Sequence, residues 1–190
     1  MRSPHPLYAG FSLDSAMHPE QLQQLAERLA SLPSQWVAGF PITLDEYGVV
    51  GRFFKCELRS IFEPIKVGEC IMSRATLVAT GPDGEPFPTE RLFQLASGED
   101  GLLKLDRLCR LIHSLNHFVV ANAAMPLVLP IHPRLFDYVR SGHGNTFSRL
   151  LAHFDLSPQH IVLEVPMGIP QTALEGFQHE GFGVRKAGEA

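Results

Sequence analysis

Cysteine is scarce in this 190-residue chain, and long apolar runs are missing. The three cysteines, Cys56, Cys70 and Cys109, are an odd number without a paired short spacing, which argues against a disulfide framework and a zinc ribbon. No stretch approaches the ~20 apolar residues that a membrane-spanning helix needs. Because the first ten residues also lack the apolar segment of a signal peptide, we expect a cytoplasmic protein without a membrane segment.

Basic residues do not outnumber acidic residues in this chain. The 16 Lys and Arg residues stand against 20 Asp and Glu residues, which gives a formal net charge of −4. No run of one sign offers a surface to a phosphate backbone, so we expect no nucleic acid among the partners. The chain is 45% hydrophobic and 19% charged, a composition that can bury a core. One domain with a small N-terminal appendage is the default at this length.

The spacing of apolar residues predicts strands first and then alternating strands and helices. Two β-prone runs, 56–67 and 70–80, meet at a turn around Gly68. Alternation in the second half favours parallel βα units around a mostly buried sheet. The predicted helices are 19–32, 89–97, 102–120, 133–140, 146–154 and 172–179, the later strands are 127–131 and 161–165, a glycine-broken link covers 141–145, and the topology of 36–58 stays unassigned.

The longest predicted helix has two faces. Apolar side chains recur on one arc, while Asp106, Arg110, His113 and His117 fall together on another. The two histidines lie one turn apart, a spacing that can chelate zinc. A zincin would carry a glutamate after the first histidine, where this chain has Ser114. We therefore interpret the polar arc as a solvated helix face.

Several short motifs stand in a fixed order between residues 53 and 187. They are Phe62-Glu63-Pro64-Ile65, Pro82-Asp83-Gly84, Gly101-Leu102-Leu103-Lys104-Leu105-Asp106-Arg107, His132-Pro133-Arg134-Leu135, Leu163-Glu164-Val165 and Gly181-Phe182-Gly183-Val184-Arg185. Their order and spacing resemble the EAL family, bacterial cyclic di-GMP phosphodiesterases built on a modified TIM-like barrel. The resemblance implies an α/β fold, a partial or modified TIM-like βα barrel of EAL type. We expect an N-terminal helical extension over 1–52 and a degenerate EAL-like domain over 53–190.

The positions that carry the chemistry of this family are mostly replaced. Active members need hard oxygen ligands for divalent metals. The resemblance places Arg74 on the first residue of the Glu-Ala-Leu motif, Pro130 on a ligand asparagine and Met167 on a second glutamate. Glu63 stands on a substrate-contacting glutamine, and Glu164 is the only apparent carboxylate ligand retained. One carboxylate cannot hold two metals, so we expect no catalytic residue, no metal site and no cofactor.

Arg74 keeps two interpretations at this stage. It could pair with a phosphate or with Glu164 across neighbouring strand ends, or it could be an exposed strand arginine. The sequence leaves both open. Glu63, Arg74 and Glu164 are therefore the candidate ligand-binding residues.

The resemblance stops at Gly188-Glu189-Ala190, where the family continues with Asp-Asp-Phe-Gly. A TIM-type barrel needs at least about 200 residues. Either the sequence covers only part of a barrel, or the native chain is a partial barrel whose exposed strand edges are covered by its N-terminal segment or by a partner.

Three hypotheses for function follow. The first is a catalytically inactive EAL-like module of cyclic di-GMP-related signalling, which binds a protein partner or a second copy of itself and has cyclic di-GMP as a further candidate ligand. The second is an active metal-dependent phosphodiesterase that a partner chain completes. The third is an unrelated α/β structural protein whose landmarks match by chance.

Overall fold

A computed structural model of the chain describes residues 19–33, 41–96, 98–138 and 143–189. The strands are β1 (Ile42–Asp45), β2 (Gly48–Phe53), β3 (Cys56–Val67), β4 (Cys70–Thr80), β5 (Pro86–Phe87), β6 (Leu127–Pro130), β7 (Ile161–Val165) and β8 (Gly183–Lys186). The helices are α1 (Pro19–Ala30), α3 (Thr89–Leu95), α4 (Gly98–Ser114), α5 (His143–His153) and α6 (Gln171–His179), with a π-helix at Leu115–Val120 and 3₁₀ helices at Pro133–Asp137 and Pro158–His160.

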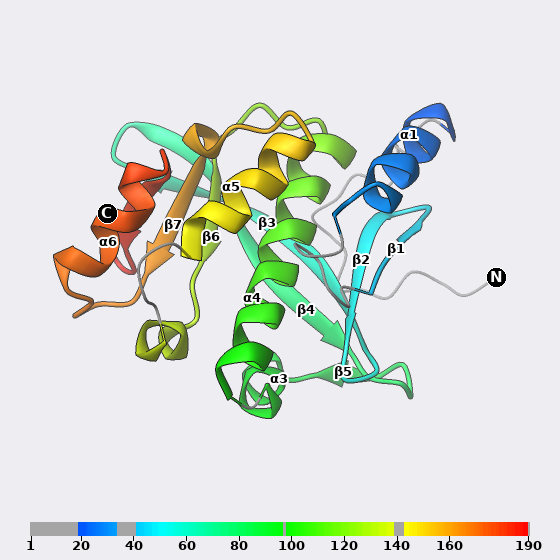
Figure 1. Cartoon of the computed structure of the whole chain (residues 1–190), viewed down its shortest axis with the longest axis horizontal. Helices are drawn as coiled ribbons and strands as arrows, with labels where there is room; N and C mark the ends of the chain where they lie inside the picture. Colours follow the sequence, from blue (N-terminus) through cyan, green and yellow to red (C-terminus); the bar gives the residue numbers. More distant parts are fainter. Residues whose placement is uncertain (1–18, 34–40, 97, 139–142, 190) are drawn as a thin grey trace.

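One mixed sheet runs through the described residues (Figure 1). Its order is β1-β2-β3-β4-β6-β7-β8, with β5 paired to β4. The pairs from β1 to β4 are antiparallel, and the pairs from β4 through β6 and β7 to β8 are parallel. Among the described strands the sheet does not close on itself, so the expected α/β partial barrel is confirmed. The stretch without an assigned topology contains β1 and β2, and the predicted boundary between residues 52 and 53 falls within β2.

The β3–β4 hairpin has the predicted bounds. Val67 pairs with Cys70, so a two-residue turn joins the two strands. Gly68 opens this turn with a φ of +57°, a left-handed conformation that glycine adopts without steric cost. Strand β7 also has its predicted bounds. Glycine-containing turns end β3 and β4, and the 3₁₀ helix Pro158–His160 precedes β7, so these limits were readable from the sequence.

Three predicted helices need correction. The helix predicted over 102–120 begins earlier as α4 and continues as the π-helix Leu115–Val120. The helix predicted over 133–140 is a short 3₁₀ helix, and its last two residues lie outside the described residues. Helix α5 begins at His143, inside the predicted glycine-broken link. Glycine near a helix start is tolerated because burial of an apolar face, here Phe147, Leu150 and Leu151, supplies most of the stability.

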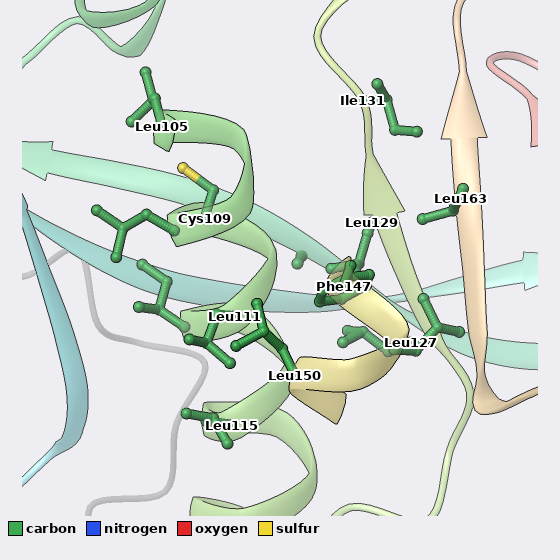
Figure 2. Packing of buried hydrophobic residues seen from close by; sticks show 14 of the residues in the cluster. Leu105, Cys109, Leu111, Leu115, Leu127, Leu129, Ile131, Phe147, Leu150 and Leu163 are labelled. Atoms are coloured by element: carbon green, nitrogen blue, oxygen red, sulfur yellow. The ribbon is translucent and has the colours of Figure 1, made fainter. Parts of the chain in front are cut away.

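The core lies between α4, α5 and one face of the sheet (Figure 2). The fully buried side chains there include Leu105, Leu111, Leu115, Leu127, Leu129, Phe147, Leu150 and Leu163. Each buried leucine contributes about 1.5–3 kcal/mol relative to an exposed one. Because side chains alternate along a strand, the neighbours of these core residues in β6 and β7 point to the opposite side. We call that side the far face of the sheet.

The polar arc of α4 is buried, so the prediction of a solvated face is wrong. Its four members, Asp106, Arg110, His113 and His117, are at most 5% exposed. Arg110 forms an ion pair with Asp106, and its guanidinium carbon lies 5.2 Å from the ring centre of Phe147 in α5. The helix is covered on both arcs because it lies between the sheet and α5. Helical spacing identifies residues that share an arc, but it does not tell what packs against that arc.

Asn116 binds β2 much as a neighbouring strand would. Its Nδ2 donates to the carbonyl oxygen of Val49, and the N–H of Val49 donates to its Oδ1, both at 2.8 Å. Nδ2 also lies 3.2 Å from Oγ of Ser60, which is 2.8 Å from Nδ1 of His113. Gly48 has a φ of +124°, and a Cβ there would lie 2.6 Å from Asn116 Oδ1. Glycine is therefore required where the β1–β2 hairpin approaches the π-helix.

Candidate functional site

Arg74 of β4 and Glu164 of β7 form an ion pair across β6. Nε and Nη2 of Arg74 lie 2.8 and 2.7 Å from Oε2 of Glu164. Arg74 is beside Val128 in the β4–β6 register, and Glu164 is beside Pro130 in the β6–β7 register. Residues at these positions project from the same side of a sheet, here the far face. Arg74 was interpreted as a partner of a phosphate, a partner of Glu164 or an exposed arginine. In the structure it forms the ion pair with Glu164.

Two more charged side chains extend this pair into a row. Glu63 of β3 is opposite Arg74, and its Oε1 lies 3.4 Å from Nη1 of Arg74. Arg185 of β8 is beside Glu164, with 3.7 Å between its Nη1 and Oε1 of the carboxylate. Glu63, Arg74, Glu164 and Arg185 thus alternate in charge across the sheet, and we call them the charged row. The structure brings the three predicted residues together and adds Arg185, which sequence reasoning missed.

Burial differs strongly along the charged row. The side chain of Glu63 is 58% exposed and that of Arg74 is 32% exposed, whereas Glu164 is only 8% exposed. A buried carboxylate is costly unless it is paired, and each oxygen of Glu164 faces a guanidinium group. Nε of Arg185 is buried and has no hydrogen-bond partner among the described residues. The row is therefore a neutralised, half-buried set of charges with one accessible arginine.

The divalent-metal centre that the EAL resemblance implies does not fit these residues. Mg²⁺ and Ca²⁺ require several oxygen ligands at short distance. Glu164 instead has guanidinium groups on both of its oxygens, and the adjacent residue of β6 is Pro130. Met167 is 69% exposed and offers no oxygen from its side chain. Within the described ranges, no group of three or more His, Cys, Asp or Glu residues is arranged to hold a metal ion.

The two histidines of the predicted zinc spacing, His113 in α4 and His117 in the π-helix, are buried. His113 contacts Ser60, and Nε2 of His117 lies 2.8 Å from the carbonyl oxygen of Met125. Burial lowers the pKa of His113 to about 3 and also lowers the pKa of His117. Both imidazoles are therefore neutral near pH 7, and each has a partner of its own.

Comparison with known proteins finds similarity in fold alone. No family model matches the sequence, and no curated protein matches it. The structure of the EAL enzyme Bd1971 in its cAMP- and cyclic di-GMP-bound form aligns with a TM-score of 0.51 at 15% identity, covering 68% of this chain and 39% of that one. The FimX EAL domain from Pseudomonas aeruginosa, bound to cyclic di-GMP, aligns with a TM-score of 0.46 at 18% identity, covering 65% of this chain and 48% of that one.

The fold of this chain is thus EAL-like, as the order of its short motifs predicts. The chain spans less than half the length of the two structures described. In the part of the chain that the structure describes, no helix is long and apolar enough to cross a membrane.

Proposed function

We propose that this chain is a catalytically inactive EAL-like module of bacterial cyclic di-GMP signalling that acts through a protein partner. The EAL-like fold supports the signalling context, because both described neighbours carry cyclic di-GMP. The observation that carries the proposal is the ion pair between Arg74 and Glu164. In this pair Glu164, the only apparent carboxylate ligand retained, neutralises Arg74 and is not free to hold a metal.

A guanidinium group cannot take over the role of the metal ions in phosphodiester hydrolysis. Metal-assisted hydrolysis of a phosphodiester uses metal ions to activate water and to neutralise the developing charge. Arg74 can supply positive charge, but a guanidinium stays protonated and has no coordination position for water. A metal at Glu164 would also have to displace Arg74 and approach Arg185. The donor set therefore supports the proposal of an inactive module.

In addition to a protein partner, we propose cyclic di-GMP as a ligand that binds the charged row without a metal. Arg74 is one-third exposed, and among the described residues its Nη1 forms an ion pair with the exposed Glu63, at 3.4 Å. Arginine binds phosphate oxygens in a planar, two-pronged geometry. A phosphodiester could replace Glu63 there while Glu164 keeps its own contact with Arg74.

The test is a hydrolysis assay with cyclic di-GMP in Mg²⁺ or Mn²⁺, followed by calorimetric titration with and without chelator. We expect no linear product, and any binding should persist in chelator and weaken in Arg74→Gln. Arg52→Gln, an exposed arginine of β2, is the matched control. Chelator-sensitive turnover that Glu164→Ala abolishes would contradict the proposal. It would support the alternative of an active phosphodiesterase that a partner chain completes.

A further inference from the structure

Strand β8 lies at one end of the sheet, and within the described residues it pairs only with β7. The N–H of Ala187, directly after β8, donates to the carbonyl oxygen of Val165 at 2.8 Å. Successive residues of a strand direct their backbone groups to opposite sides. The N–H and C=O groups of Val184 and Lys186 therefore point away from β7. We call this side of the strand the outer edge of β8.

Glu189 occupies the outward backbone groups of Lys186. The N–H of Lys186 donates to Oε2 of Glu189 at 3.0 Å, and the N–H of Glu189 donates to the carbonyl oxygen of Lys186 at 3.2 Å. The guanidinium of Arg185 also donates to the carbonyl oxygen of Glu189. Glu189 thus makes the two bonds to Lys186 that an adjacent strand would make. At Val184 no described residue takes the corresponding groups.

The turn that returns Glu189 to the strand depends on Gly188. Its φ is +82°, a left-handed conformation that residues with a Cβ rarely adopt. The turn reverses the chain directly after β8, so Glu189 lies against the outer edge. Unpaired strand edges are sites of association, and native proteins often block them. Glu189 is such a block, held by backbone and side-chain bonds together.

We propose that the outer edge of β8 pairs with the same edge of a second copy of this chain, and that Glu189 controls access to it. The two outward-facing residues are spaced two apart, so the edge is self-complementary in an antiparallel pair. Val184 of each copy then lies opposite Lys186 of the other, and four backbone hydrogen bonds form around a two-fold axis at Arg185. The repulsion between the two Arg185 side chains is reduced because each has Glu164 beside it. Each of the four bonds uses the N–H or C=O group of one Lys186, two bonds for each copy, and Glu189 occupies both of these groups in the single chain.

The first experiment compares Glu189→Ala with the unchanged chain by sedimentation over a concentration series. We expect the alanine variant to dimerise at a concentration at least about tenfold lower, the equivalent of about 1.4 kcal/mol. Glu189→Gln should behave like the unchanged chain, because its amide oxygen also accepts from the Lys186 N–H. Glu175→Ala, an exposed glutamate of α6, is the control for lost charge. Equal association of Glu189→Ala and Glu175→Ala would overturn the proposal.

A second experiment tests the register by cross-linking in a Cys70→Ser, Glu189→Ala background. In the proposed dimer, residue 185 of one copy lies opposite residue 185 of the other, as a non-hydrogen-bonded pair. The two Cα atoms are then about 4.5 Å apart, a distance that a disulfide can bridge. Arg185→Cys should therefore give a covalent dimer under mild oxidation, and Lys186→Cys should give much less. Equal cross-linking at both positions, or none at 185, would overturn the pairing. The readout does not depend on whether cyclic di-GMP binds.

Discussion

The polar arc of α4 and the charged row of the sheet contain similar side chains in opposite surroundings. Every member of the arc is at most 5% exposed, and each has a partner in the sheet, in the arc itself or, for His117, in the carbonyl oxygen of Met125. In the charged row the exposure of the side chains differs, from the buried Glu164 to Glu63, which is 58% exposed. Burial therefore separates polar groups that are closed off from solvent from charges that solvent reaches. The following predictions test this contrast in order of expected effect.

Asp106→Ala should cause the largest loss of stability. It leaves the guanidinium of Arg110 buried without its partner, and Nε and Nη1 of that group already lack one among the described residues. Removal of one member of a buried ion pair costs about 3–5 kcal/mol. Urea denaturation measures the effect, with Lys104→Ala on the exposed side of α4 as control. If both variants unfold at the same urea concentration, the arc does not hold the fold together.

Acid should weaken the fold through His113. Its folded-state pKa of about 3 lies below the usual value near 6.5, so the unfolded state binds the proton more readily. Stability from this group is complete above about pH 6.5 and is lost as the pH falls toward 3, by about 2 kcal/mol at pH 5. Denaturation at pH 7 and pH 5 measures the loss. His113→Gln, which can still bond to Ser60, should have a clearly smaller pH dependence; an unchanged dependence would argue against His113 as its source.

Arg74→Gln should have a smaller effect than either change in the arc. Arg74 is one-third exposed, and Glu164 keeps Arg185 as a second cation. We expect a loss of about 1 kcal/mol, and less than about 0.5 kcal/mol for Glu63→Ala, whose side chain is mostly in solvent. Thermal unfolding of the two variants side by side provides the measurement. A loss from Arg74→Gln as large as that from Asp106→Ala would remove the distinction between the two groups.

Sequence reasoning succeeded where local turn chemistry limits an element. The turn around Gly68 separated β3 from β4, and apolar runs bounded β6 and β7 to within one residue. It failed on the polar arc because the partners of His113 and Asn116 come from β2 and β3, more than 50 residues away. Such partners follow from the packing of a helix on a sheet, which periodicity does not specify.

The candidate site was predictable only in part. The sequence left open whether Arg74 pairs with a phosphate, pairs with Glu164 or is an exposed strand arginine, and the structure has the ion pair with Glu164. Arg185 was missed because its role depends on the β7–β8 register, which sets it beside Glu164. Glu189 was missed for a similar reason, since a turn after the strand returns it to Lys186. Whether the row binds a ligand stays a prediction.

The contact between Asn116 and Val49 also affects the order in which the molecule opens. The amide proton of Val49 is held by a side chain of the π-helix, so it exchanges with solvent only when that helix moves away from β2. The N-terminal hairpin and the end of the long helix should therefore lose protection from hydrogen exchange together. Removal of the hairpin would leave the side-chain amide of Asn116 facing water in place of Val49. We therefore expect the first strands to unfold together with the rest of the sheet.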